Sequence, residues 1–108
     1  MDKKIYTSRQ VKKFATDFVN YLKQEHGLII NSAYIFGSYA KKKPKNWSDI
    51  DVCIVSPKFN RTDPLVYLWR RRRDIDTQRG IEPYGIAPDG FHKFNPIASE
   101  VKKYGIKI

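Results

Sequence analysis

A Gly-Ser pair and two aspartates separated by one residue are the groups in this chain best suited to chemistry. Gly37 and Ser38 come after a short apolar run, and Asp49 and Asp51 open another that continues to Val55. Glycine lets the backbone turn sharply and approach a ligand, and the Ser38 hydroxyl and nearby amides can donate to phosphate oxygens. A Gly-Ser pair alone is also common turn chemistry, so its meaning depends on the residues next to it in the chain.

The two aspartates share one face of a predicted strand. Side chains alternate along a strand, so Asp49 and Asp51 point the same way, about 7 Å apart along the chain. Like charges this close repel unless cations lie between them, and hard divalent ions such as Mg²⁺ suit such oxygen ligands. The alternative is a solvated Asp49 and an Asp51 paired with a lysine. The Gly-Ser pair, ten-residue spacer and Asp-x-Asp would coincide in roughly one random chain in a hundred, which favours a phosphate and metal site.

Helices and strands predicted on either side position these residues. A first helix begins after Thr7, which forms a capping-box pattern with Gln10, and it ends at Gly27. Its apolar stripe recurs at helical spacing: Val11, Phe14, Phe18 and Leu22. A short strand over residues 33–36 then leads into the Gly-Ser turn, and a second strand, rich in β-branched residues, covers 50–55.

The second half of the chain continues the alternation. A helix capped by Asp63 is predicted to begin at Pro64 and to run to Gly80. One face of that helix is marked by Leu65, Leu68, Trp69 and Arg72. A third strand covers 81–86, where Pro83 indicates a sheet edge because it has no amide hydrogen to donate. The last helix runs from an Asn95 cap to a C′ glycine, Gly105, with apolar positions Ile97, Val101 and Tyr104. We therefore expect a single α/β domain over residues 1–108, with helices packed on a small mixed sheet of three to four strands.

Composition limits the partners and the compartment. Twenty-one basic residues against eleven acidic ones give a formal charge of +10, which attracts polyanions or simply keeps the protein dispersed. Cys53 is the single cysteine and lies in an apolar run, so we expect a buried thiol in a reducing compartment. The N-terminus lacks a signal-peptide core, and no stretch has the ~18 apolar residues of a membrane span. We expect a cytoplasmic protein without a membrane partner.

The segment GSYAKKKPKNWSDIDV and the elements around it resemble the minimal nucleotidyltransferases of the DNA polymerase β superfamily. The family signature is a strand, Gly-Ser, a spacer and Asp-x-Asp, and the resemblance spans nearly the whole chain. It implies a fold like the palm of polymerase β, with Gly37 and Ser38 binding a nucleotide. It also implies that Asp49, Asp51 and Glu82 are catalytic and bind metal, Glu82 being the only acid on the strand after the long helix.

Two features of the sequence bear on that resemblance. Glu82 has the alternative of being a solvent-facing residue of an edge strand, in which case Asp74 or Asp76 would be the nearest acids to serve as a base. Lys42 departs from the family pattern, because a glycine is common at that position, and this puts the loop conformation in question.

Four consecutive arginines, 70–73, cannot all face one ligand on a helix, and such a run is more often a solvated face.

The resemblance implies in-line transfer of a nucleoside monophosphate, AMP from ATP, to a hydroxyl group, with release of pyrophosphate and with two Mg²⁺ ions bound. Minimal members commonly act as protein adenylyltransferase antitoxins, so a separately encoded helical toxin of the HEPN type is the implied partner. RNA or another nucleic acid, or a small alcohol, stays open as acceptor. The competing interpretation is a non-catalytic basic module that binds a partner protein or nucleic acid, and the intact Ser38, Asp49 and Asp51 argue against it.

Overall fold

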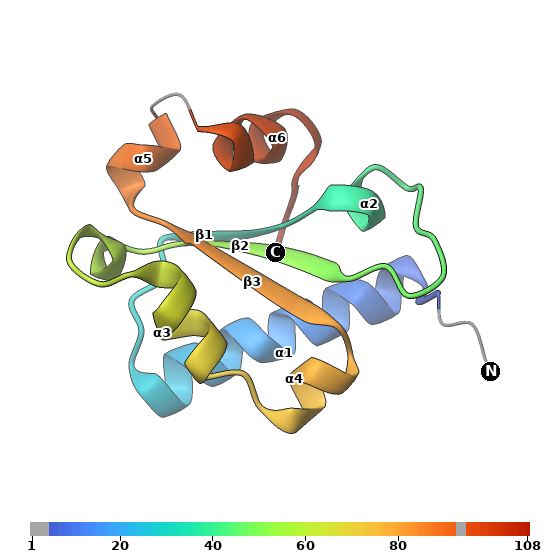
Figure 1. The fold of residues 1–108 in the computed structure, drawn as a ribbon, viewed down its shortest axis with the longest axis horizontal. Coiled ribbons are helices and arrows are strands. Elements are labelled where there is room, and N and C mark those ends of the chain that lie inside the picture. Colours follow the sequence, from blue (N-terminus) through green and yellow to red (C-terminus); the bar gives the residue numbers. More distant parts are fainter. Residues whose placement is uncertain (1–4, 93–94) are drawn as a thin grey trace.

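The computed structural model describes residues 5–92 and 95–108 as helices packed on both faces of a four-stranded sheet (Figure 1). The elements come in the order α1 (Ser8–His26), β1 (Ser32–Phe36), α2 (Gly37–Ala40), β2 (Ile50–Val55), the 3₁₀ helix η1 (Pro57–Asn60), α3 (Pro64–Arg70), α4 (Asp74–Gln78), β3 (Ile81–Ile86), α5 (Pro88–His92), α6 (Pro96–Tyr104) and β4 (Ile106–Lys107). The strand order is β3-β2-β1-β4, with β2 and β3 parallel and the other pairs antiparallel. The expected α/β fold with a small mixed sheet is confirmed.

Helix α1 begins and ends where its capping signals predict. The Thr7 hydroxyl accepts from the Gln10 amide at 3.1 Å, and the Gln10 side chain accepts from the Thr7 amide at 2.8 Å. Gly27 ends the helix with φ +61, the left-handed conformation that glycine adopts at little cost. One face of the helix is buried against the sheet through Val11, Ala15, Phe18, Val19 and Leu22.

The strands bury two separate sets of side chains because successive residues point to opposite faces. On one face, Ile50, Val52 and Ile54 of β2 pack with α1 and with Leu68 of α3. On the other face, Cys53 and its neighbours form a smaller cluster with α6: Phe36, Val55, Ile86, Ala98 and Val101. Cys53 is a free thiol with no exposed surface, as expected. The second face is the one that continues into the predicted carboxylates.

The single helix predicted from Pro64 to Gly80 is wrong, because the chain forms two short helices there. α3 ends at Arg70, and Arg73 takes an extended conformation before α4 begins. The buried Asp76 carboxylate accepts from the Arg73 amide at 2.9 Å and from its guanidinium at 2.9 and 2.8 Å. Arg73 also reaches Asp17 of α1 at 2.9 Å, so a tertiary ion-pair cluster fixes the break.

The predicted solvent-facing run of arginines is also largely wrong. Arg71 stacks on the Tyr67 ring and Arg72 on the Trp69 ring, with guanidinium carbons 3.7 and 3.9 Å from the ring centroids. Of the four residues, only Arg70 is exposed. The predicted apolar face of this region is likewise half right, since Leu68 is buried whereas Leu65 and Trp69 remain 54% and 36% exposed.

Strand β3 lies at the sheet edge, as Pro83 predicts. Side chains from the α3–α4 region cover this edge: the Trp69 indole donates to the Pro83 carbonyl at 3.0 Å, and Arg72 Nη1 donates to the Ile81 carbonyl at 3.2 Å. Carbonyls satisfied in this way are not available to pair with another chain. At the other edge, the terminal residues form the two-residue strand β4, which the sequence patterns do not predict.

Helix α6 begins at its Asn95 cap as predicted, but it ends differently. Gly105 has φ −60 rather than a left-handed conformation. A Cβ at this position would overlap the Val101 carbonyl oxygen. Close approach, and not backbone handedness, therefore requires glycine here.

Lys42 has φ +59, so the loop keeps the left-handed conformation for which the family pattern has glycine. Replacing Lys42 with glycine is expected to stabilise the protein by up to about 1 kcal/mol. Glycine removes the strain of the left-handed conformation, which is ~1–2 kcal/mol. This gain exceeds the ~0.4–1 kcal/mol that is lost because glycine gives the unfolded chain more conformational entropy. The matched change Lys43→Gly removes the same charge where φ is not positive, and should destabilise by ~0.5–1 kcal/mol. Urea unfolding measures the stability of both variants. Similar effects of the two changes would contradict the assignment of backbone strain to Lys42.

Candidate active site

The pairing of β2 with β3 brings two of the predicted carboxylates together. Asp51 and Glu82 are direct partners in the parallel register, and Phe36 of β1 pairs with Asp51 on its other side. Asp49 lies just before β2, and its carboxylate is beside Gly80, whose left-handed turn leads into β3. The three acids therefore gather at the end of the sheet where both parallel strands begin.

The predicted Gly-Ser turn meets this cluster directly. Gly37 comes directly after β1 with φ +75, and a Cβ added there would overlap the Asp51 carboxylate. Glycine is required both for the backbone conformation and for this contact. Ser38 is the next residue, in α2, and is partly exposed. The Gly37 backbone and Asp51 thus form one continuous surface.

Glu82 is held by Tyr84, a residue that the motif-based prediction does not include. The Tyr84 hydroxyl donates a hydrogen bond to Glu82 Oε1, and its ring packs edge-on against Phe36 with centroids 5.3 Å apart. The period of two along β3 would have placed Tyr84 on the Glu82 face. Burial, with the bond to Glu82 and the charges of Glu82, Asp51 and Asp49, raises the pKa of Tyr84.

A fourth carboxylate, Glu100 of α6, is also absent from the predicted site. Its Oε2 accepts from the Gly37 amide at 3.2 Å, and its Oε1 pairs with Lys41 Nζ at 3.0 Å. No local signal could have found it, because Glu100 is 63 residues from Gly37 in the chain. In this structure, an anionic group therefore already occupies the amide of the predicted phosphate-binding turn.

Burial and neighbouring carboxylates raise the pKa values of Asp49 and Asp51. Burial, together with the charges of Glu82, Asp49 and Glu100, raises the pKa of Asp51 from 3.8 to about 7. Burial, with a shared hydrogen bond to Glu82 and the Glu82 charge, also raises the pKa of Asp49, while the Arg72 charge opposes that change. Arg72 is thus the arginine of the 70–73 run that lies near the cluster.

Asp51 should make the metal-free protein less stable as the pH rises. Because the folded-state pKa lies above the unfolded one, the native state keeps a proton between about pH 4 and pH 7 that the unfolded state has lost, so stability falls across that window. Asp51→Asn should remove the fall, leaving the variant more stable by about 1–2 kcal/mol at pH 8, a figure reduced for the partial exposure of the side chain. Urea unfolding in a chelator measures it, and a wild-type-minus-variant difference that is constant with pH would refute it.

The donor chemistry of the cluster fits a divalent cation. In the described part of the chain, no three His, Cys, Asp or Glu side chains are already arranged around a common metal position. Burial first, and then the neighbouring carboxylates, raise the pKa values of Asp49 and Asp51, and a bound cation would stabilise their ionised forms. Oxygen donors with uncompensated charge are what Mg²⁺ binds, provided that the side chains turn toward one point.

Of the alternative acids of the α4 region, Asp76 is engaged away from this site. The Asp76 carboxylate is fully buried and is engaged by Arg73. Asp74 lies in the first turn of the same helix and is exposed. Asp76 therefore serves the α1–α4 ion-pair cluster, whereas Glu82 is the acid that the strand register places beside Asp51.

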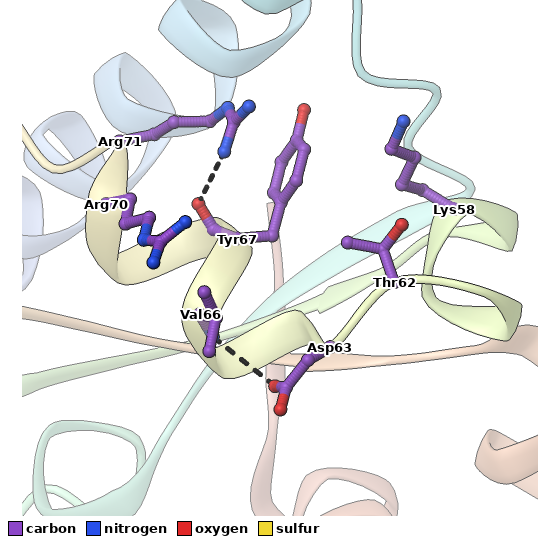
Figure 2. A pocket seen from close by; sticks show the side chains of 7 residues that line it. All are labelled: Lys58, Thr62, Asp63, Val66, Tyr67, Arg70 and Arg71. Atoms are coloured by element: carbon purple, nitrogen blue, oxygen red, sulfur yellow. Dashed lines mark hydrogen bonds between the residues drawn. The ribbon is translucent and has the colours of Figure 1, made fainter.

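A separate pocket of about 370 Å³ lies at the opposite end of β2 from the carboxylates, between η1 and α3. Figure 2 shows the Tyr67 ring between Arg71 and Lys58, with Val66 and Arg70 on the same helix. Exposed apolar side chains of the same helix adjoin it, including Leu65 and Trp69. This end of the molecule combines basic and apolar surface and contains none of the predicted site residues.

Solved structures of similar fold place the architecture in a known class. A candidate nucleotidyltransferase from Sulfolobus solfataricus matches with a TM-score of 0.63 and 17% identity, over 96% of this chain and 87% of that chain. A toxin–antitoxin structure with AMP-PNP matches with a TM-score of 0.54 and 16% identity, over 84% and 69%. A mutant of the toxin–antitoxin MntA-HpeT matches with a TM-score of 0.52 and 13% identity, over 94% and 72%. At these identities, the likeness establishes the fold.

The fold and the strand-borne carboxylates beside a glycine turn define a nucleotidyltransferase-like domain. The sequence model described as "Nucleotidyltransferase domain" matches residues 16–108. The chain belongs to this family, which is part of the polymerase β superfamily. No curated protein sequence gives a significant match.

Proposed function

We propose that this protein is a metal-dependent nucleotidyltransferase that moves AMP from ATP to an acceptor hydroxyl. The observation that carries the proposal is the contact between the Gly37 backbone and the Asp51 carboxylate, beside Glu82. A phosphate-binding turn touching paired carboxylates is the arrangement that joins a nucleotide to its metal ions. The retained acids also favour catalysis over a non-catalytic basic binding module.

The role proposed for each residue follows from its position in the fold. Gly37 and Ser38 bind the triphosphate through the backbone amide and the hydroxyl at the start of α2. Asp49 and Asp51 hold two Mg²⁺ ions together with Glu82. Bound metal supplies charge stabilisation to the phosphoryl group and makes the acceptor hydroxyl more acidic. Glu82 comes from the neighbouring strand, β3, and we assign to it the proton that the acceptor hydroxyl releases.

The partner proposed for the reaction is a separately encoded helical toxin of the HEPN type. Support comes from the fold shared with two toxin–antitoxin structures, one described with AMP-PNP. The other carries two aspartate-to-glutamate changes two positions apart, the same spacing as Asp49 and Asp51. The exposed Leu65, Val66 and Trp69 offer apolar surface to such a partner.

We also propose that residues 1–108 act as one minimal domain, and that they do so in the cytoplasm, where ATP is available. The proposed site residues lie on two strands of one sheet or next to its strands, and Cys53 is a free thiol. No helix within residues 5–92 and 95–108 has the length and apolar character to span a bilayer.

Transfer of a traceable α-phosphate tests the proposed function. The purified protein is incubated with Mg²⁺, ATP labelled at the α-phosphate and an extract of the native host. Label on one protein that also co-purifies with the chain is the expected result. Label on RNA would refute the toxin partner and preserve nucleotidyl transfer. No label on any acceptor, together with no nucleotide binding, would refute the enzyme.

Glu100 should compete with the nucleotide for the Gly37 amide and for Lys41. Glu100→Gln removes a negative charge from the turn, so the affinity for Mg²⁺–ATP is expected to rise about three- to tenfold, or about 0.7–1.4 kcal/mol. Glu25→Gln, on the exposed surface of α1, removes the same charge and should have no such effect. Titration calorimetry compares the two, and unchanged or weaker binding by Glu100→Gln would mean that the carboxylate only holds α6 against the turn.

A further inference from the structure

The hydroxyl of Tyr84 lies inside the carboxylate cluster, where the proposed reaction requires a hydroxyl acceptor. It donates its proton to Glu82 Oε1, the group to which we assign the acceptor's proton. Asp49 and Asp51 are close enough to act electrostatically on the same phenol. Tyr84, Asp51 and Glu82 are each partly exposed and Asp49 is exposed, so the cluster is open to solvent.

Other tyrosines of the chain are engaged elsewhere. The Tyr39 hydroxyl accepts from the Tyr6 amide, and the Tyr21 hydroxyl bonds with His26. Tyr34 stacks on Phe91 with ring centroids 5.5 Å apart. Within residues 5–92 and 95–108, Tyr84 is the tyrosine whose hydroxyl donates a hydrogen bond to a carboxylate. The juxtaposition of acceptor and base is therefore specific to this residue.

We propose that the protein transfers a nucleoside monophosphate to its own Tyr84. The inference rests on the proposed function, since it uses the same nucleotide and the same carboxylates. Tyr84 Oη attacks the α-phosphorus of the triphosphate, forming an oxygen–phosphorus bond. The bond from that phosphorus to the bridging oxygen of the β-phosphate breaks, and pyrophosphate leaves with the electron pair. The phenol proton passes to Glu82 along the existing hydrogen bond.

An acceptor within the site gives the reaction two kinetic properties. Because base and nucleophile are on the same strand, the reaction is intramolecular, and its rate per chain does not depend on protein concentration. The attached nucleotide stays at the cluster and fills it, so each chain is modified at most once. Self-modification would therefore block transfer to any other acceptor.

Labelling of the purified protein alone tests the inference. Wild type, Tyr84→Phe and the matched control Tyr34→Phe are each incubated with Mg²⁺ and, in turn, the four ribonucleoside triphosphates labelled at the α-phosphate. Intact mass and peptide mapping locate the product. We expect label on the Tyr84 peptide, approaching one per chain, with a first-order rate unchanged on about tenfold dilution. Tyr34→Phe should label as wild type does, and Tyr84→Phe should lose at least about 90% of the label.

Calorimetry with Mg²⁺–ATP separates a lost acceptor from a lost fold, because Tyr84→Phe should still bind nucleotide. Equal labelling of Tyr84→Phe, or label mapped to another residue, overturns the inference and leaves the proposed function standing. Transfer to a protein in extract without any label on Tyr84 has the same meaning. Wild-type protein that neither binds a nucleotide nor labels any acceptor overturns the proposed function itself.

Discussion

Replacing Asp49 and Asp51 together by asparagine is expected to abolish Mg²⁺–ATP binding and to reduce nucleotidyl transfer to background. The amide keeps the size of each side chain and removes the charge that a hard divalent ion requires. Of the three proposed metal ligands only Glu82 then remains, and Mg²⁺–ATP loses the two carboxylates that link metal to triphosphate. Titration calorimetry measures the binding, and α-phosphate labelling measures the transfer.

The double variant carries its own control against misfolding. Asp51 destabilises the metal-free protein at neutral pH, since burial and neighbouring carboxylates raise its pKa to about 7. The variant should therefore unfold at higher urea concentration than wild type while losing nucleotide binding. A stable variant that still binds Mg²⁺–ATP as wild type does would refute the metal site. Ser38→Ala, which removes one hydroxyl donor, should weaken binding much less.

Glu82→Gln should separate binding from chemistry. We expect Mg²⁺–ATP affinity within a few-fold of wild type and transfer slower by about 10²–10⁴-fold, the range for loss of a positioned base. The amide oxygen can still accept from the Tyr84 hydroxyl, so the local packing is preserved while the proton acceptor is lost. A fall in rate at nearly unchanged affinity is the signature of an interaction made mainly in the transition state.

Measuring transfer as a function of ATP concentration distinguishes the two roles of Glu82. A lower kcat with a similar KM supports the base, whereas a higher KM with an unchanged kcat would assign Glu82 to nucleotide binding alone. Transfer at the wild-type rate would make Glu82 a structural residue of the edge strand. Asp76 would not replace it, because that carboxylate is buried against Arg73.

Local signals in the sequence were sufficient for most of the elements. The caps at Thr7, Asp63 and Asn95 each bond to amides within three residues, so the pattern that predicts them is complete in the sequence. Strand β2 has the predicted bounds because a run of β-branched residues between turn residues has few other conformations. Gly37 was identifiable for the same reason, since its required turn is a property of the local backbone.

Tertiary contacts decided what local patterns did not. The chain breaks between α3 and α4 because Arg73 binds Asp76 and also Asp17, 56 residues away. Helical periodicity across that segment could not reveal a contact with α1. The same limit hid Glu100, which reaches Gly37 from the far end of the chain.

By itself, the sequence determined the family signature, the caps, the core strand and the residue types available for chemistry, because each depends on neighbours along the chain. Only the tertiary structure decided that β2 and β3 run parallel, with Glu82 beside Asp51. That register fixes which carboxylates share a site, and it results from how two strands far apart in the chain bury their faces against the helices. The placement of Glu100 at the same cluster is likewise a product of packing, which no spacing in the sequence encodes. The period of two along β3, by contrast, already puts Tyr84 on the face that carries Glu82.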